Sequence, residues 1–227
     1  MKFSDYYKRI EHCLSEELPG RAAQYKMAPA LRKRPDTVMN SDTRKAGVLI
    51  LLYNSREKEY YTTLIRKTLY DGVHSGQISF PGGKHEARDP DLVSTALRET
   101  EEEIGVPEKH IQILGKLTPL HIPVSNYDVQ PFVGILKAEY PFKPDKKEVE
   151  EIFPINIRKL VHPDSLVRNK SFRENERQIT APYYQYHHLK IWGATAMMLS
   201  EFIEIHHKST LAHPAKPIRK RIPDKKH

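Results

Sequence analysis

The hydrophobic positions of the chain form short continuous runs and helical repeats. Residues Phe3 to Leu18 carry apolar side chains at the three- and four-residue spacing of a helix, and Pro19-Gly20 ends that pattern. Ala46 to Tyr53 and Tyr60 to Ile65 are apolar runs of strand length on either side of a turn-like segment. The pattern further predicts strands at 111–117, 129–136 and 179–186, a short turn or helix at 148–153 and a closing helix at 194–206.

The clearest predicted helix follows a glycine pair, Gly82-Gly83. Asp89 is predicted as its N-cap with Pro90 at the first helical position, and Gly105 is expected just beyond its end. Two faces are predicted for this helix. The apolar stripe that should pack on a sheet consists of Val93, Leu97, Thr100 and Ile104.

The second face of this helix is acidic. Glu99, Glu102 and Glu103 share it because residues three and four apart lie on one side of a helix, whereas Glu101 turns toward solvent. Carboxylates about 5.5 Å apart repel each other by roughly 3 kcal/mol per pair at an effective dielectric near 20. A hard divalent cation such as Mg²⁺ or Mn²⁺ would relieve that repulsion. A solvated acidic face is the alternative for a glutamate cluster taken without its context.

Composition narrows the class of protein. The 227 residues include one cysteine, Cys13, which excludes an internal disulfide framework and a cysteine-cluster metal site. No apolar run approaches the ~20 residues of a membrane span, so we expect a soluble chain without a membrane partner. The net charge of +8 divides into +4 over residues 1–45, −2 over 46–207 and +6 over 208–227. We therefore predict an N-terminal helix with a basic arm (1–45), one nearly neutral domain (46–207) and a basic tail (208–227).

The segment from Gly83 to Val106 resembles the Nudix box. The match includes Arg98, the three glutamates of the acidic face, Gly105 and Val106. The segment departs from the family pattern at three points. Asp89 stands at the position of the first glutamate, and eight residues instead of seven separate it from Arg98. Thr100 replaces an aliphatic residue. The role of the first acidic residue is left between Asp89 and Glu86.

The resemblance to the Nudix family implies a fold and a chemistry. The implied fold is an α/β/α sandwich with a mixed β-sheet and a loop–helix–loop catalytic motif. By resemblance, Glu99, Glu102 and Glu103 bind the divalent cation, Glu102 also being catalytic, and Arg98 orients a neighbouring carboxylate. The implied reaction is hydrolysis of a diphosphate linkage.

The residues upstream of the box indicate a branch of the family. Leu64 to Leu69 and His74 to Gly83 resemble the signature of the coenzyme A pyrophosphatase branch, as does Ile191 to Ala196. This implies cleavage of CoA or acyl-CoA to 3′,5′-ADP and 4′-phosphopantetheine or its acylated form. The substrate-binding candidates are Arg66, Lys67, His74, Gln77, Gly82, Gly83 and Lys84. Glu148 is the preferred general base or extra ligand, with Glu151 second.

Two other functions remain open at this stage. A Nudix hydrolase of ADP-ribose, NADH or another nucleoside diphosphate derivative would use the same metal chemistry. A non-catalytic, nucleic-acid-binding protein would use the basic ends instead, but the three glutamates on one helix face argue against it. The sequence is also compatible with a homodimer. The absence of a C-terminal Ser-Lys-Leu address and the single cysteine favour the cytoplasm.

Overall fold

The computed structural model describes residues 2–29, 42–55, 59–68, 76–174 and 177–211, with the backbone alone at 167–170, 172–174 and 177. His74 and nearly all of the predicted basic tail lie outside the described residues. The helices and strands, in chain order, are α1 (Phe3–Ser15), α2 (Gly20–Tyr25), β1 (Arg44–Asn54), β2 (Tyr60–Lys67), β3 (Ile78–Ser79), β4 (Gly82–Lys84), α3 (Leu92–Ile104), η2 (Glu108–His110), β5 (Ile111–Lys116), β6 (Leu120–Ile122), β7 (Tyr127–Leu136), β8 (Val149–Asn156), α4 (Ile157–Leu160), η3 (Pro163–Ser165), β9 (Leu166–Glu174), β10 (Arg177–Tyr186), β11 (Leu189–Trp192) and α5 (Gly193–Leu211).

A mixed eight-stranded sheet forms the centre of the fold. Its middle strand β1 pairs in parallel with β7 and antiparallel with β2 and β4. Strands β5 and β6 extend the β7 side of the sheet, and β3 and β8 both pair with β2. The predicted α/β class with a mixed sheet is therefore confirmed.

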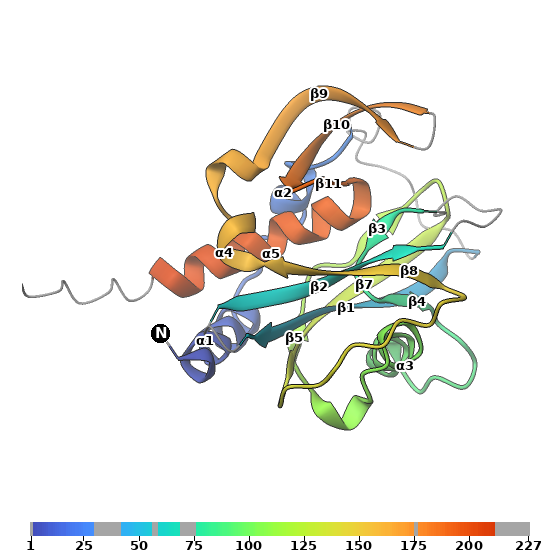
Figure 1. Ribbon diagram of the computed structural model, residues 1–227, viewed down its shortest axis with the longest axis vertical. Helices are drawn as coiled ribbons and strands as arrows, with labels where there is room; N and C mark the ends of the chain where they lie inside the picture. Colours follow the sequence, from blue (N-terminus) through green and yellow to red (C-terminus); the bar gives the residue numbers. More distant parts are fainter. Residues whose placement is uncertain (1, 30–41, 56–58, 69–75, 175–176, 212–227) are drawn as a thin grey trace, which may run out of the picture.

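The two faces of the sheet are covered by different helices, with α3 on one side and α5 on the other (Figure 1). Successive side chains of a strand point to opposite faces, so Leu49 and Leu51 pack toward α3 while Ile50 and Leu52 join the α5 side. The buried residues of α1 belong to the same cluster as those of α5. The predicted N-terminal helix thus contributes to the core.

The structure differs from the pattern-based prediction at three places. In the segment 148–153, expected as a turn or short helix, residues 149–153 belong to the eight-residue strand β8, because pairing with β2 supplies their backbone hydrogen bonds. The arm contains an unpredicted helix, α2. The predicted strand at 179–186 is the middle of a separate three-stranded sheet, β9–β10–β11, beside α5 (Figure 1).

Helix α3 also begins two residues later than predicted. Asp91, and not Asp89, is the N-cap, since its Oδ1 accepts a hydrogen bond from the Ser94 amide at 2.8 Å. The end at Gly105 is confirmed by its left-handed φ of 72°. Because α3 begins after Asp91, the Asp89 carboxylate does not cap the helix and binds Arg98 instead. In the described part of the chain, no helix has the length and apolar character that crossing a membrane requires.

Candidate active site at the glycine loop and helix α3

Gly82 and Gly83 bring the backbone of β4 against both β1 and α3. Gly82 has a φ of 145°, and a Cβ there would lie 2.4 Å from the carbonyl oxygen of Gly47. At Gly83, a Cβ would lie 2.4 Å from Oε2 of Glu99. Only residues without side chains allow this approach, so the glycine pair places peptide groups directly beside the carboxylates of α3.

Glu103 is the most enclosed carboxylate of the site, with 0% of its residue surface exposed. Its Oε2 accepts a hydrogen bond from the Gly82 amide at 2.8 Å, and its Oε1 lies 2.8 Å from the Nζ of Lys67. The same Nζ donates to the Gly82 carbonyl at 3.3 Å. Burial raises the pKa of Glu103 to about 7, and the Lys67 ammonium opposes that rise.

Glu99 lies one turn earlier on the same face of α3. Its side chain is 13% exposed, and its Oε1 accepts a hydrogen bond from Nη1 of Arg98 at 2.9 Å. Burial raises the pKa of Glu99, and Arg98 and Lys67 act in the opposite direction. The buried Glu103 and the partly buried Glu99 therefore place two carboxylates next to the glycine pair.

Arg98 ties the loop before α3 to the helix. Its Nε and Nη2 donate to the two oxygens of Asp89 at 2.8 and 3.0 Å, and Nη2 also donates to the Lys84 carbonyl at 3.1 Å. This bidentate pair holds the pKa of Asp89 well below its usual range. Glu86, the other candidate for this role, is half-exposed and pairs with Arg88 at 2.8 Å instead.

The third glutamate of the predicted metal set has a more open position. The side chain of Glu102 is 45% exposed, with its Oε2 2.7 Å from Arg98 Nη1 and its Oε1 3.1 Å from Arg88 Nη2. Glu101 is exposed, as predicted. Arg98 thus contacts both Glu99 and Glu102, while Lys67 contacts Glu103.

The neighbouring residues Arg66 and Lys67 point to opposite faces of the sheet. Lys67 faces α3, whereas Arg66 lies 3.7 Å from Glu151 and its guanidinium carbon is 5.1 Å from the centre of the Phe153 ring. The alternation of side chains along β2 separates them. Of these two basic residues, Lys67 is the one whose side chain lies beside the carboxylates of α3.

The remaining predicted residues lie around this centre. Gln77 contributes its carbonyl oxygen to the Lys67 amide at 3.3 Å, and Lys84 has an exposed side chain. Glu148 is exposed, and its carbonyl accepts from the Thr68 amide at 2.9 Å, one residue beyond Lys67. The structure therefore places the Glu148 backbone at the end of β2, close to the site.

Asp89, Thr95 and His85 form a series of hydrogen-bonded side chains that was not predicted from the sequence. Thr95 donates from Oγ1 to Asp89 Oδ2 at 2.9 Å, and its Oγ1 lies 2.9 Å from Nδ1 of His85. Thr95 follows Asp89 by six residues and belongs to no motif, so only the fold reveals the contact. It fixes the orientation of the carboxylate that holds Arg98.

The carboxylate oxygens of α3 are the type of donor that a hard divalent cation prefers. Across the described ranges, no three His, Cys, Asp or Glu side chains converge into a ready metal-binding group. Oxygen donors are nevertheless gathered at Glu99 and Glu103, and Gly83 lacks the Cβ that would fill the space against Glu99. Both carboxylates have a raised pKa, so a cation beside them would stabilise their charged forms.

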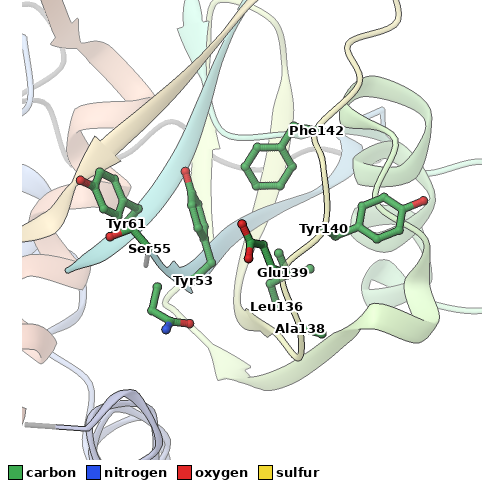
Figure 2. A pocket seen from close by; sticks show the side chains of 9 residues that line it. Tyr53, Ser55, Tyr61, Leu136, Ala138, Glu139, Tyr140 and Phe142 are labelled. Carbon is green, nitrogen blue, oxygen red and sulfur yellow. The ribbon is translucent and has the colours of Figure 1, made fainter. Parts of the chain in front are cut away.

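A surface cavity among the described residues is remote from this site. It has a volume of about 490 Å³ and is lined by Tyr53, Tyr61, Tyr140 and Phe142 among others (Figure 2). Tyr53 is five residues along β1 from Val48, which pairs with Gly82, a separation of roughly 17 Å at about 3.3 Å per residue. The carboxylates of α3 do not line this cavity.

Comparison with known proteins supports one family. The NUDIX domain model matches residues 43–182. The chain is 36% identical over 174 residues to the uncharacterized Nudix hydrolase NudL of Yersinia pestis (strain Pestoides F), covering 73% of this chain and 84% of that protein. Two similar solved structures are a MutT protein from Methanosarcina mazei Go1 (TM-score 0.47, 16% identity, 73% of this chain and 93% of that one) and a C. elegans Ap4A hydrolase binary complex (TM-score 0.43, 16% identity, 52% and 83%).

Proposed function

Because the chain belongs to the Nudix hydrolase family, we propose that it is a metal-dependent diphosphatase of coenzyme A or acyl-CoA, forming 3′,5′-ADP and 4′-phosphopantetheine or its acylated form. One observation carries the proposal. The run from Leu64 to Gly83, which resembles the CoA pyrophosphatase branch, contributes Lys67 and Gly82, and both contact the buried Glu103. The segment that resembles this branch thus contacts a glutamate of the proposed catalytic centre.

Glu99, Glu102 and Glu103 would hold the divalent cation, for which we propose Mg²⁺ or Mn²⁺. When bound, such a cation neutralises phosphate oxygens and lowers the pKa of a water nucleophile. Glu103 and Glu99 offer buried oxygens, and the half-exposed Glu102 offers a carboxylate on the solvent side. The three carboxylates therefore range from fully buried at Glu103 to half-exposed at Glu102.

Arg98 acts as a positioning residue in this proposal. Its guanidinium is fixed by Asp89, so its Nη1 holds Glu99 and Glu102 in fixed directions. A bidentate ion pair of this kind resists rotation of the guanidinium. We propose that loss of the Asp89–Arg98 pair would misplace both carboxylates at once.

Glu148 is the proposed general base. Its exposed side chain can reach water, and its backbone is held at the end of β2 beside Lys67. Glu151 faces Arg66 on the other side of the sheet, so it is less suited to act on a nucleophile near Glu103.

Recognition of the substrate is proposed to rely on cations around the site. CoA carries a diphosphate and a 3′-phosphate, which guanidinium and ammonium groups bind through charge-assisted hydrogen bonds. Lys67 and the exposed Lys84 flank the glycine pair, and His74 and Gln77 complete the set proposed near the carboxylates. Arg66, on the other face of the sheet, is proposed for a phosphate farther from them. The single cysteine supports the cytoplasm as the proposed compartment.

The test is a product assay with competing substrates. Purified protein is incubated with CoA, acetyl-CoA, ADP-ribose and NADH at equal concentration with Mg²⁺ or Mn²⁺, and the products are identified by mass spectrometry. The proposal expects 3′,5′-ADP from the CoA substrates with the highest kcat/KM. A tenfold preference for ADP-ribose or NADH would refute the CoA assignment.

A pair of variants tests the site itself. Glu103→Gln and Glu102→Gln remove one charge each and are expected to lower kcat at least 100-fold. The control, Glu101→Gln, changes an exposed carboxylate of the same helix and should retain wild-type turnover. Equal activity of Glu103→Gln and Glu101→Gln would place the metal elsewhere.

A further inference from the structure

Lys67 and Glu103 form an ion pair at the position where the proposed function requires a divalent cation. The Lys67 ammonium lies 2.8 Å from Oε1 of Glu103, and the other carboxylate oxygen is bound by the Gly82 amide. Glu103 is completely buried, so a counter-charge is needed to keep its carboxylate ionised. In this structure Lys67 provides that charge.

A divalent cation on Glu103 would have to compete with this ammonium. The carboxylate has two oxygens, and the Gly82 amide already occupies Oε2. Oε1 is therefore the oxygen for which both cations compete. Two cations on one buried oxygen would repel each other strongly, because the surroundings screen charge poorly.

The two basic residues of the site differ in their freedom to move. The side chain of Arg98 is 15% exposed, and Asp89 binds it through two parallel hydrogen bonds. The side chain of Lys67 is 25% exposed and reaches Glu103 from the last position of β2. A lysine ammonium is a point charge on a flexible four-carbon stem, so it can turn to solvent through side-chain rotation alone.

We propose that Lys67 is an exchangeable internal counter-ion: it neutralises Glu103 in the metal-free protein and is displaced toward solvent when a divalent cation binds. The inference rests on the proposed function, since it requires metal at Glu103. The displaced ammonium then stands at the opening of the site, where the substrate's phosphates would enter. The same lysine thereby stabilises the metal-free protein and contributes a positive charge to the metal-loaded one.

Lysine labelling of the wild-type protein measures this displacement directly. The protein is treated briefly with acetic anhydride at pH 8, with and without saturating Mg²⁺, and acetylation at each lysine is quantified by mass spectrometry. We expect Mg²⁺ to raise the labelling rate of Lys67 at least threefold and to leave exposed Lys84 unchanged. Unchanged or slower labelling of Lys67, at a Mg²⁺ concentration that raises the Tm, would overturn the inference.

Metal affinity supplies an independent readout. Isothermal titration calorimetry with Mn²⁺ compares Lys67→Met with Lys84→Met, which removes a nearby charge that is not paired with Glu103. We expect the Kd of Lys67→Met to fall at least tenfold and that of Lys84→Met by no more than threefold. An equal or weaker affinity in Lys67→Met would contradict the exchange. Should Lys67→Met fail to fold, Lys67→Gln keeps a hydrogen-bond donor without the charge and carries the same expectation.

The outcomes separate this inference from the proposed function. If Mn²⁺ binds the wild type and Lys67 labelling rises while CoA stays intact, the exchange is supported and the substrate assignment fails. If CoA is cleaved and Lys67 labelling does not respond to metal, the exchange alone is wrong. If neither Mg²⁺ nor Mn²⁺ binds the wild type, both are refuted.

Discussion

The Asp89–Arg98 pair provides the sharpest test of how this site is held together. Asp89→Asn keeps the size of the side chain but removes its charge and one of the two oxygens that receive the guanidinium. Two charge-assisted hydrogen bonds of 2.8 and 3.0 Å are lost or weakened. At about 1.5 kcal/mol each for hydrogen bonds to charged groups, the free energy of unfolding should fall by about 3 kcal/mol. Glu99 and Glu102 remain as partners of Arg98, so a larger loss is not expected.

Urea unfolding followed by circular dichroism measures this loss, and Glu86→Gln is the matched control. Glu86 is half-exposed and pairs with the exposed Arg88, so its substitution should change the free energy of unfolding by about 0.5 kcal/mol or less. Turnover of Asp89→Asn should also fall at least tenfold, because Arg98 positions two carboxylates. If Glu86→Gln proved as destabilising as Asp89→Asn, the assignment of Asp89 as the support of Arg98 would be wrong.

Three further predictions concern other parts of the fold. Burial lowers the pKa of His206 to about 4; the unfolded chain therefore binds a proton near pH 6.5 that the folded chain does not, and the contribution of His206 to stability should decline by about 2 kcal/mol from pH 7.5 to 5. In urea titrations, the free energy of unfolding of His206→Gln relative to the wild type should therefore be about 2 kcal/mol higher at pH 5 than at pH 7.5, and that of the exposed His207→Gln should not change in this way. Gly83→Ala forces a methyl group to within 2.4 Å of the Glu99 carboxylate, so kcat should fall at least tenfold with little change in Tm, and normal kcat would contradict the close approach. Glu148→Gln should lower kcat at least tenfold at saturating metal with little change in Tm, and a wild-type kcat would exclude it as the base.

The sequence by itself determined the residue types of the site and most of the framework. The apolar runs predicted β1, β2, β5, β7 and β10, and the helical spacing predicted α1, α3 and α5. These predictions succeeded because the repeat of the hydrophobic positions is a local property of the chain. The glutamate spacing on α3 likewise determined which carboxylates share a face.

Tertiary pairing decided what local pattern left open. Strand β8 draws its hydrogen bonds from β2, a segment more than eighty residues earlier in the chain, so residues 148–153 carried no clear local signal for a strand. Asp89 is a residue type that favours N-cap positions. In the folded chain, however, Arg98 binds its carboxylate and Asp91 caps α3. Both differences arise because backbone and side-chain hydrogen bonds are satisfied by whichever partner the fold brings closest.

The same distinction applies to the charged residues of the site. The sequence indicated three glutamates for a cation and three basic residues, Arg66, Lys67 and Lys84, for phosphates, but it did not reveal that Glu103 would be fully buried. Nor did it show that Lys67 would face Glu103 while Arg66 faces Glu151 on the other side of the sheet. Spacing along one helix or strand determines which side chains share a face. Burial and the choice of counter-ion depend on elements distant in the sequence, and only the tertiary structure brings those together.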